Sequence, residues 1–192
     1  MVQQDEEIDL ALAELFFVSR GVVAERIQVG KTKTPDFRLH RGDEVVGFCE
    51  VKSPQDIFAE RTLRAIAEAP EGQLGGIIER GHTSRQYRCL ERFARTASGQ
   101  LQAANPTHSV PNILMIVNRD THSQHDDFVE AVTGYFGAHR VVEKTLRDAF
   151  PEIDAYVWAD WSPGGEEIER IEGLFRHESP LKQSARDLLK LG

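Results

Sequence analysis

Two side chains in the first third of the sequence have the types and spacing that hydrolytic chemistry needs. Glu50 and Lys52 are two positions apart at the end of the apolar segment 45–52. Side chains alternate between the faces of a strand, so a strand here places the carboxylate and the ammonium group on one face. Burying such groups costs several kcal/mol unless they are paired or bind an ion. This pattern favours a functional role over a purely structural one.

A second carboxylate, Asp36, follows Pro35 at the start of the preceding segment. Opposite residues of an antiparallel pair share a face, so Asp36 and Glu50 meet if the register makes them partners. Such a register has an even sum of paired residue numbers, and we therefore expect an odd-length loop around Gly42. Two converging carboxylates suit a hard cation such as Mg²⁺. Lys52 beside them could orient an attacking water or stabilise charge on a phosphate.

Taken together, Thr34-Pro35-Asp36-Phe37 and the later Glu50-Val51-Lys52 resemble the signature of the PD-(D/E)xK nuclease superfamily. The resemblance covers roughly residues 22–117. It implies a restriction-endonuclease-like α/β fold, in which a mixed β-sheet is flanked by helices. It also implies a nuclease, more often an endonuclease, that hydrolyses phosphodiester bonds with Mg²⁺ or Mn²⁺, in DNA more often than in RNA. Asp36 and Glu50 would bind the metal, and Lys52 would complete the catalytic set.

The resemblance implies further site residues outside these two segments. Many members of the superfamily place a glutamate of the first helix at the metal site. Glu7 and Glu14 both qualify, because residues seven apart share one helical face, and the choice between them stays open. Members often add a Gln or Lys from the helix after the third strand. Gln100 is the candidate for that accessory role.

Basic residues that could hold a phosphate backbone occur in two groups. One is a row at steps of three and four on the predicted helix that ends at residue 104, away from its apolar stripe. A solvated helix face explains that row equally well. The other group is near the proposed site. The row consists of Arg85, Arg88, Arg92 and Arg95, and the second group includes Lys33 and Arg38.

Other metal motifs are weak. His122 and His125 have the helical spacing of zinc ligands, but no matching Cys or His cluster accompanies them. Polar residues at a helix start are the better interpretation of this pair. The chain has only two cysteines, Cys49 and Cys89, too few for a disulfide framework or a four-cysteine zinc site.

The elements that must position these residues follow from hydrophobic periodicity and turn residues. We expect an α/β arrangement in which three strands form a meander, with an inserted flap at about residues 53–83. The expected helices are 5–20, 83–104, 124–136 and a last helix that starts at Ser179-Pro180 and ends at 189. The expected strands are 22–29, 34–40, 45–52, 113–117 and 155–159.

Composition sets the remaining bounds. The chain has 192 residues, 40% of them hydrophobic, which suits a single domain spanning residues 1–192. No apolar run is long enough for a membrane span, and the acidic start lacks the order of a secretory signal, so we expect a cytoplasmic protein. The formal charge of −8 restricts any nucleic-acid surface to local patches. It also favours one alternative, a catalytically inactive nucleic-acid-binding or protein-interaction module with the same fold. A homodimer would suit an enzyme that cuts both strands of a duplex.

Overall fold

The structure is a computed structural model that describes residues 2–28, 34–54, 84–118, 125–140, 144–161 and 168–191. Nearly all of the expected flap, together with Lys33 and His122, falls outside these residues. The helices are α1 (Val2–Val18), α3 (Ser84–Ala104), α4 (His125–Thr133), α5 (Leu146–Ala149) and α6 (Lys182–Leu189). The strands are β1 (Val23–Arg26), β2 (Phe37–Arg41), β3 (Glu44–Lys52), β4 (Asn112–Asn118), β5 (Tyr135–Phe136), β6 (His139–Arg140), β7 (Ala155–Trp161) and β8 (Ile168–Phe175).

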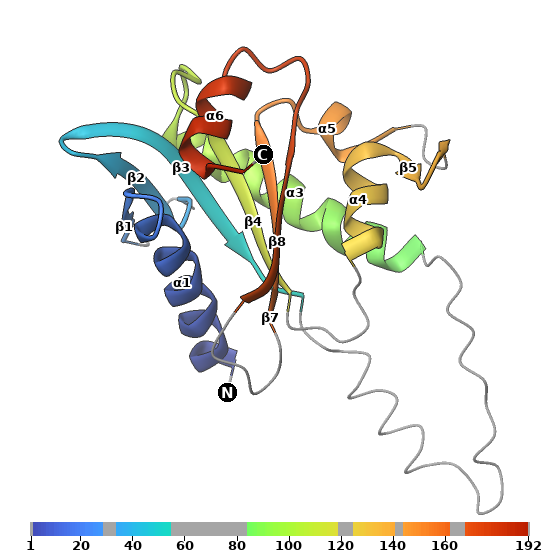
Figure 1. The fold of residues 1–192 in the computed structure, drawn as a ribbon, viewed down its shortest axis with the longest axis horizontal. Helices are drawn as coiled ribbons and strands as arrows, with labels where there is room; N and C mark the ends of the chain where they lie inside the picture. The colour runs from blue at the N-terminus through green and yellow to red at the C-terminus, as the bar shows by residue number, and fades with distance from the viewer. Residues whose placement is uncertain are drawn as a thin grey trace, which may run out of the picture.

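The core is one six-stranded sheet with the order β1-β2-β3-β4-β7-β8. Strands β3, β4 and β7 run parallel to one another, while β1 and β2 at one side and β8 at the other add antiparallel pairs. Helices flank the sheet (Figure 1). The expected α/β class with a mixed, helix-flanked sheet is confirmed. None of the described helices is long and apolar enough to cross a membrane.

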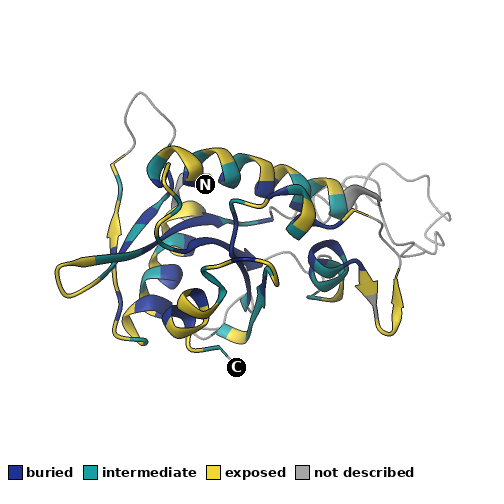
Figure 2. Cartoon of the chain, turned by 90° about the horizontal axis from the view of Figure 1, so that it is seen from above, coloured by how far each residue is buried: buried dark blue, intermediate teal, exposed yellow. Residues whose placement is uncertain are grey.

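Alternation along the strands divides the interior into two hydrophobic layers. On one face, Cys49 and Val51 of β3 pack in a cluster with residues of α1 and α6, such as Phe16 and Leu188. On the other face, Phe48 packs in a cluster with residues of α3, α4 and α5. Figure 2 shows these buried residues along the sheet between the helices, with exposed residues on the outer sides. Glu50 and Lys52 belong to the face that α3 covers, because they alternate with Cys49 and Val51.

The hairpin between β2 and β3 has the expected register, by a different route. The pairs Phe37–Cys49 and Arg38–Phe48 have the same, even sum of residue numbers, which continues to Asp36 opposite Glu50. The expected odd-length loop is wrong, because Arg41 pairs with Glu44 and leaves a two-residue turn. A register shift between Leu39 and His40 restores the parity, since β3 contributes one extra residue there. Gly42 has a φ of +62°, as such tight turns require.

Several expected element boundaries differ from the observed ones. Helix α4 ends at Thr133 rather than 136, because Gly134 adopts a φ of +81°. Helix α6 begins at Lys182, so Ser179-Pro180 is not its first turn. Strand β8 was not predicted: its half-buried sequence IERIEGLF carries charged residues and a glycine. Backbone pairing with β7 holds this segment as a strand, although its own hydrophobic pattern does not predict one.

Candidate active site

Backbone pairing brings Asp36, Glu50 and Lys52 together where β2 begins and β3 ends. Oδ2 of Asp36 accepts a hydrogen bond from the backbone N–H of Val51 at 2.7 Å, and the Asp36 N–H donates to Oε2 of Glu50 at 3.2 Å. Nζ of Lys52 donates to Oε1 of Glu50. On its other side, β3 pairs with β4, where Glu50 is beside Leu114. The expected constellation is therefore a connected group on one sheet face.

Burial makes this group electrostatically unusual. The Glu50 side chain is 0% exposed, whereas Lys52 is 24% exposed. Burial raises the pKa of Glu50 to about 7, nearby Asp36 adds to the rise, and Lys52 opposes it. Burial also raises the pKa of Asp36, against the Val51 hydrogen bond and the charge of Lys52. One ammonium group thus only partly compensates the buried carboxylate of Glu50 and the half-buried carboxylate of Asp36.

The donor set fits a hard divalent cation. Mg²⁺ is usually bound through one or two carboxylates, with waters in the remaining positions. Asp36 and Glu50 supply those two carboxylates, and a cation between them would offset the burial that raises both pKa values and the charge of Asp36 that further raises the pKa of Glu50. Among the described residues, no group of three or more His, Cys, Asp or Glu side chains gathers in metal-binding geometry.

Gln100 contacts the segment that carries Asp36, not the carboxylates themselves. Its Nε2 donates to the backbone carbonyl of Thr34 at 2.7 Å. Its Oε1 is buried and has no hydrogen-bond partner among the described residues, as is also true of Thr34 Oγ1. Gln100 thereby ties α3 to the chain two residues before Asp36.

The structure brings the first-helix glutamates to an arginine. Glu7 Oε2 is 2.6 Å from Nη1 of Arg26, and Glu14 Oε2 is 3.8 Å from its Nε. Arg26 pairs with Phe37, whose side chain belongs to the α1 layer, so this group is on the sheet face opposite Glu50. Arg26 nevertheless acts on Asp36 through its charge. Burial raises the pKa of Asp36, and the positive charge of Arg26 opposes that rise.

The basic residues near the site are partly engaged. Arg38 Nη1 is 3.4 Å from Glu25 Oε2, and His40 is 3.0 Å from the same oxygen. On α3, Arg88 and Arg92 are exposed. Arg95 in the same row pairs with Glu91 at 2.5 Å. Lys33 and the side chain of Arg85 lie outside the described residues.

The sequence reasoning missed polar residues at the carboxyl ends of β4 and β7. Oδ1 of Asp160 accepts from the indole N–H of Trp158 at 2.7 Å and from the amide of Asn118 at 2.9 Å. By alternation these residues share the face of Lys52, with Asn118 on the neighbouring strand and Trp158 and Asp160 one strand further away. The sequence does contain a sign of this group, because a polar residue directly follows each of the two predicted strands. Open α/β sheets usually bind ligands at that edge, the carboxyl ends of the strands. Trp158 itself is 1% exposed, as expected for a core residue.

Only one member of the pair His122 and His125 lies within the described residues. His125 begins α4, and its Nε2 is 2.6 Å from Glu172 Oε2, while His122 is not described. No zinc site can be built from the described residues around it.

The chain matches no family model, no curated protein and no solved structure. Its chemistry must therefore be argued from its own residues.

Proposed function

We propose that the chain is a divalent-metal-dependent nuclease of the restriction-endonuclease-like type, which hydrolyses phosphodiester bonds in DNA rather than RNA. The observation that carries this proposal is the hydrogen-bonded group of Asp36, Glu50 and Lys52 on one sheet face. These are two carboxylates and one ammonium group, the set that metal-assisted phosphodiester hydrolysis needs. The choice of DNA rests on the resemblance alone.

The order of the elements supports the finer fold assignment. Helix α1 precedes the antiparallel strands β1, β2 and β3, and the chain then passes through α3 into β4, which is parallel to β3. The resembled superfamily has the same succession in its core. Strands β7 and β8 extend this sheet beyond β4.

The site residues divide the work of hydrolysis. Asp36 and Glu50 would hold Mg²⁺ or Mn²⁺, which supplies Lewis acidity and lowers the pKa of a bound water. Glu50 now holds the ammonium group of Lys52. With a cation bound by Glu50, Lys52 would be able to donate to a phosphate oxygen or to orient the attacking water. The exposure of Lys52, at 24%, leaves its ammonium group accessible from solvent.

The test is cleavage of a mixed set of DNA and RNA substrates, with Mg²⁺, Mn²⁺ or a chelator. We expect cleavage that requires the metal and that Asp36→Ala and Lys52→Ala each reduce by a factor of about 100 or more. Asp43→Asn is a matched control, because it removes an exposed carboxylate at the turn of the same hairpin. Cleavage that persists in both site variants would contradict the site assignment. Metal binding without cleavage would instead support a non-catalytic module.

A further inference from the structure

A group of five basic side chains lies at the end of the sheet opposite the candidate active site. Its members come from α5, from the connection between β8 and α6, and from α6 itself. Figure 1 shows α5 and α6 at the end opposite the tip of β3. We call these residues the cationic cluster: Arg147, Arg176, His177, Lys182 and Arg186.

Electrostatic coupling shows that these side chains are neighbours. Nζ of Lys182 is 3.0 Å from Nδ1 of His177. The charges of Lys182, Arg147 and Arg186 lower the pKa of His177. Arg147 and Arg176 both act on the buried hydroxyl of Tyr156. Arg147 thus links the two halves of the cluster.

Nearby carboxylates form hydrogen bonds with other groups, although the charge of Asp148 still acts on Arg147. Asp148 accepts hydrogen bonds from the backbone N–H and hydroxyl of Thr145, which caps α5. Asp154 is engaged by Ser179 and His108. Within the described part of the chain, none of the cluster's arginines or its lysine forms an ion pair with a carboxylate. In a protein with a formal charge of −8, such a local excess of positive charge is unusual.

Two buried donors in the cluster lack partners. Nε of Arg147 and Nε of Arg176 are both inaccessible and form no hydrogen bond within the described structure. Burial lowers the pKa of Arg147, which reports the same desolvation. A buried charged donor without an acceptor costs stability, and such groups in folded proteins usually have a protein, water or ligand partner.

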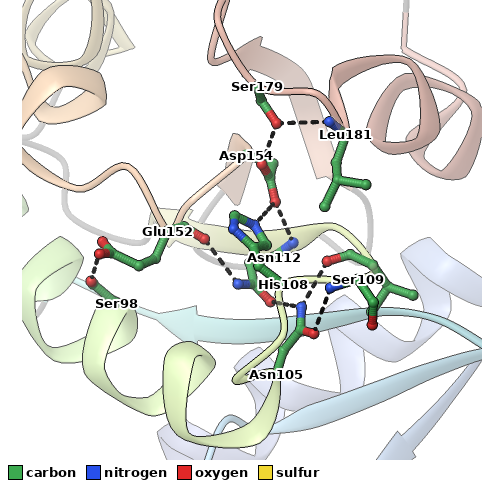
Figure 3. Close-up of polar contacts among 10 residues, drawn as sticks. Ser98, Asn105, His108, Ser109, Asn112, Glu152, Asp154, Ser179 and Leu181 are labelled. Atoms are coloured by element: carbon green, nitrogen blue, oxygen red, sulfur yellow. Dashed lines mark hydrogen bonds and ion pairs between the residues drawn. The ribbon is translucent and has the colours of Figure 1, made fainter.

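The backbone that carries the cluster is fixed by a polar network (Figure 3). Asp154, which is 0% exposed, accepts from the N–H of Asn112 at 2.9 Å and from the hydroxyl of Ser179. The Ser179 hydroxyl in turn accepts from the N–H of Leu181 at 3.0 Å. The N–H of Arg176 donates to the Asp154 carbonyl at 2.9 Å. The connection before α6 is therefore held in place before any ligand arrives, which lowers the ordering cost of binding.

We propose that the cationic cluster is a binding site for a phosphate-type oxyanion, separate from the candidate active site. Guanidinium groups match the geometry of phosphate oxygens, and lysine adds a compact positive charge. The anion would be attracted by the charges of Arg147, Arg176 and Lys182, and the buried Nε atoms of the two arginines would gain an acceptor only after those side chains turn toward it. Its source is either a free phosphate or phosphomonoester, or a backbone phosphate of a nucleic acid.

The direct test follows the imidazole signals of His177 by NMR while inorganic phosphate is added to the full chain in chelator-containing buffer. We expect a saturable shift in the wild type. Lys182→Gln and Arg147→Gln should each weaken phosphate binding by about tenfold. Arg41→Gln is the charge-matched control, because Arg41 is an exposed arginine of the β2–β3 hairpin that is not a member of the cluster. Lys182 is at the start of α6 and half-buried, so its variant keeps the test valid if Arg147→Gln unfolds.

Oligonucleotide binding then identifies the source of the phosphate. A backbone ligand predicts that Lys182→Gln weakens oligonucleotide binding and that phosphate competes with the oligonucleotide. A free phosphate ligand predicts unchanged oligonucleotide binding and weakened binding of inorganic phosphate. No saturable His177 shift with either ligand, or a shift that Lys182→Gln leaves intact, would overturn the proposal. Because the readout needs neither metal nor cleavage, it is independent of the nuclease proposal.

Discussion

Asp36 and Glu50 are joined by a hydrogen bond from backbone to side chain: the Asp36 N–H donates to Oε2 of Glu50 at 3.2 Å. The side chain of Asp36 returns to the same strand, where it accepts from the Val51 N–H at 2.7 Å. The two carboxylates are therefore placed by main-chain contacts as well as by packing. Main-chain placement makes the site less sensitive to surface substitutions than a site built on loops.

Metal binding should stabilise the protein through these two residues. A ligand that binds only the folded state adds about 2.7 kcal/mol at a concentration of 100 times Kd. We expect Mn²⁺ or Mg²⁺ to raise the unfolding temperature of the wild type by several degrees. The rise should disappear in Glu50→Gln and remain in Asp43→Asn, as measured by differential scanning calorimetry. Equal stabilisation of wild type and Glu50→Gln would place the metal elsewhere.

Without metal, stability should fall as pH rises through the range in which Glu50 loses its proton. An ordinary glutamate titrates near 4.5, while burial and Asp36 raise the pKa of Glu50 to about 7. Between these values the folded state binds more protons than the unfolded chain, so the free energy of unfolding decreases with pH. The decrease attributable to Glu50 is on the order of 3 kcal/mol, because each unit of pKa difference corresponds to about 1.4 kcal/mol.

Chemical denaturation at several pH values in chelator measures this slope. Glu50→Gln has no proton to lose, so its stability should change less across the same range. A wild-type profile parallel to that of Glu50→Gln would contradict the burial argument. Saturating metal should also flatten the wild-type profile, because it favours the charged carboxylates.

Gln100 should affect the rate of cleavage more than substrate affinity. Its hydrogen bond to the Thr34 carbonyl fixes the chain just before Asp36. Gln100→Ala removes this tether, at a cost of about 1 kcal/mol in stability. Steady-state kinetics should show a lower kcat with little change in KM, and a weaker affinity for Mn²⁺. If Gln100→Ala left both metal affinity and kcat unchanged, Gln100 would have no effect on the site beyond protein stability.

The arginine row of α3 should contribute to nucleic-acid affinity. Arg88 and Arg92 are exposed, whereas Arg95 is paired with Glu91. Removing one arginine that binds a phosphate of duplex DNA should reduce the salt dependence of log K by about 0.9. If both arginines bind phosphates, the double variant of Arg88 and Arg92 to Gln should reduce the slope by about 1.8 in binding titrations. Arg95→Gln is the control on the same helix, and an equal effect from it would indicate general charge rather than direct phosphate binding.

The central strands and the site's sheet face could be predicted because they depend on local pattern. Alternation places Glu50 and Lys52 on one face, and the continuous apolar run of β4 indicates a buried strand. The hairpin shows the limit. Parity alone required an odd loop, but one extra residue in β3 allowed a two-residue turn with Gly42. A bulge has no strong local signature.

Contacts between distant segments were beyond sequence reasoning. The pairing of Arg26 with Glu7 and Glu14 depends on how α1 packs against β1. The cationic cluster likewise combines residues whose neighbourhood depends on the polar network around Asp154. Strand β8 is an edge strand with charged residues. It forms a strand because it pairs with β7, and its own hydrophobic pattern does not predict this.

The most direct test of the central claim is a crystal structure with Mn²⁺, whose anomalous scattering locates the ion without reference to the protein. The proposal predicts one strong peak between the carboxylates of Asp36 and Glu50, at metal–oxygen distances of about 2.0–2.2 Å, with Lys52 no longer paired to Glu50. A peak at other residues, or no peak at Mn²⁺ concentrations that saturate binding in solution, would contradict it.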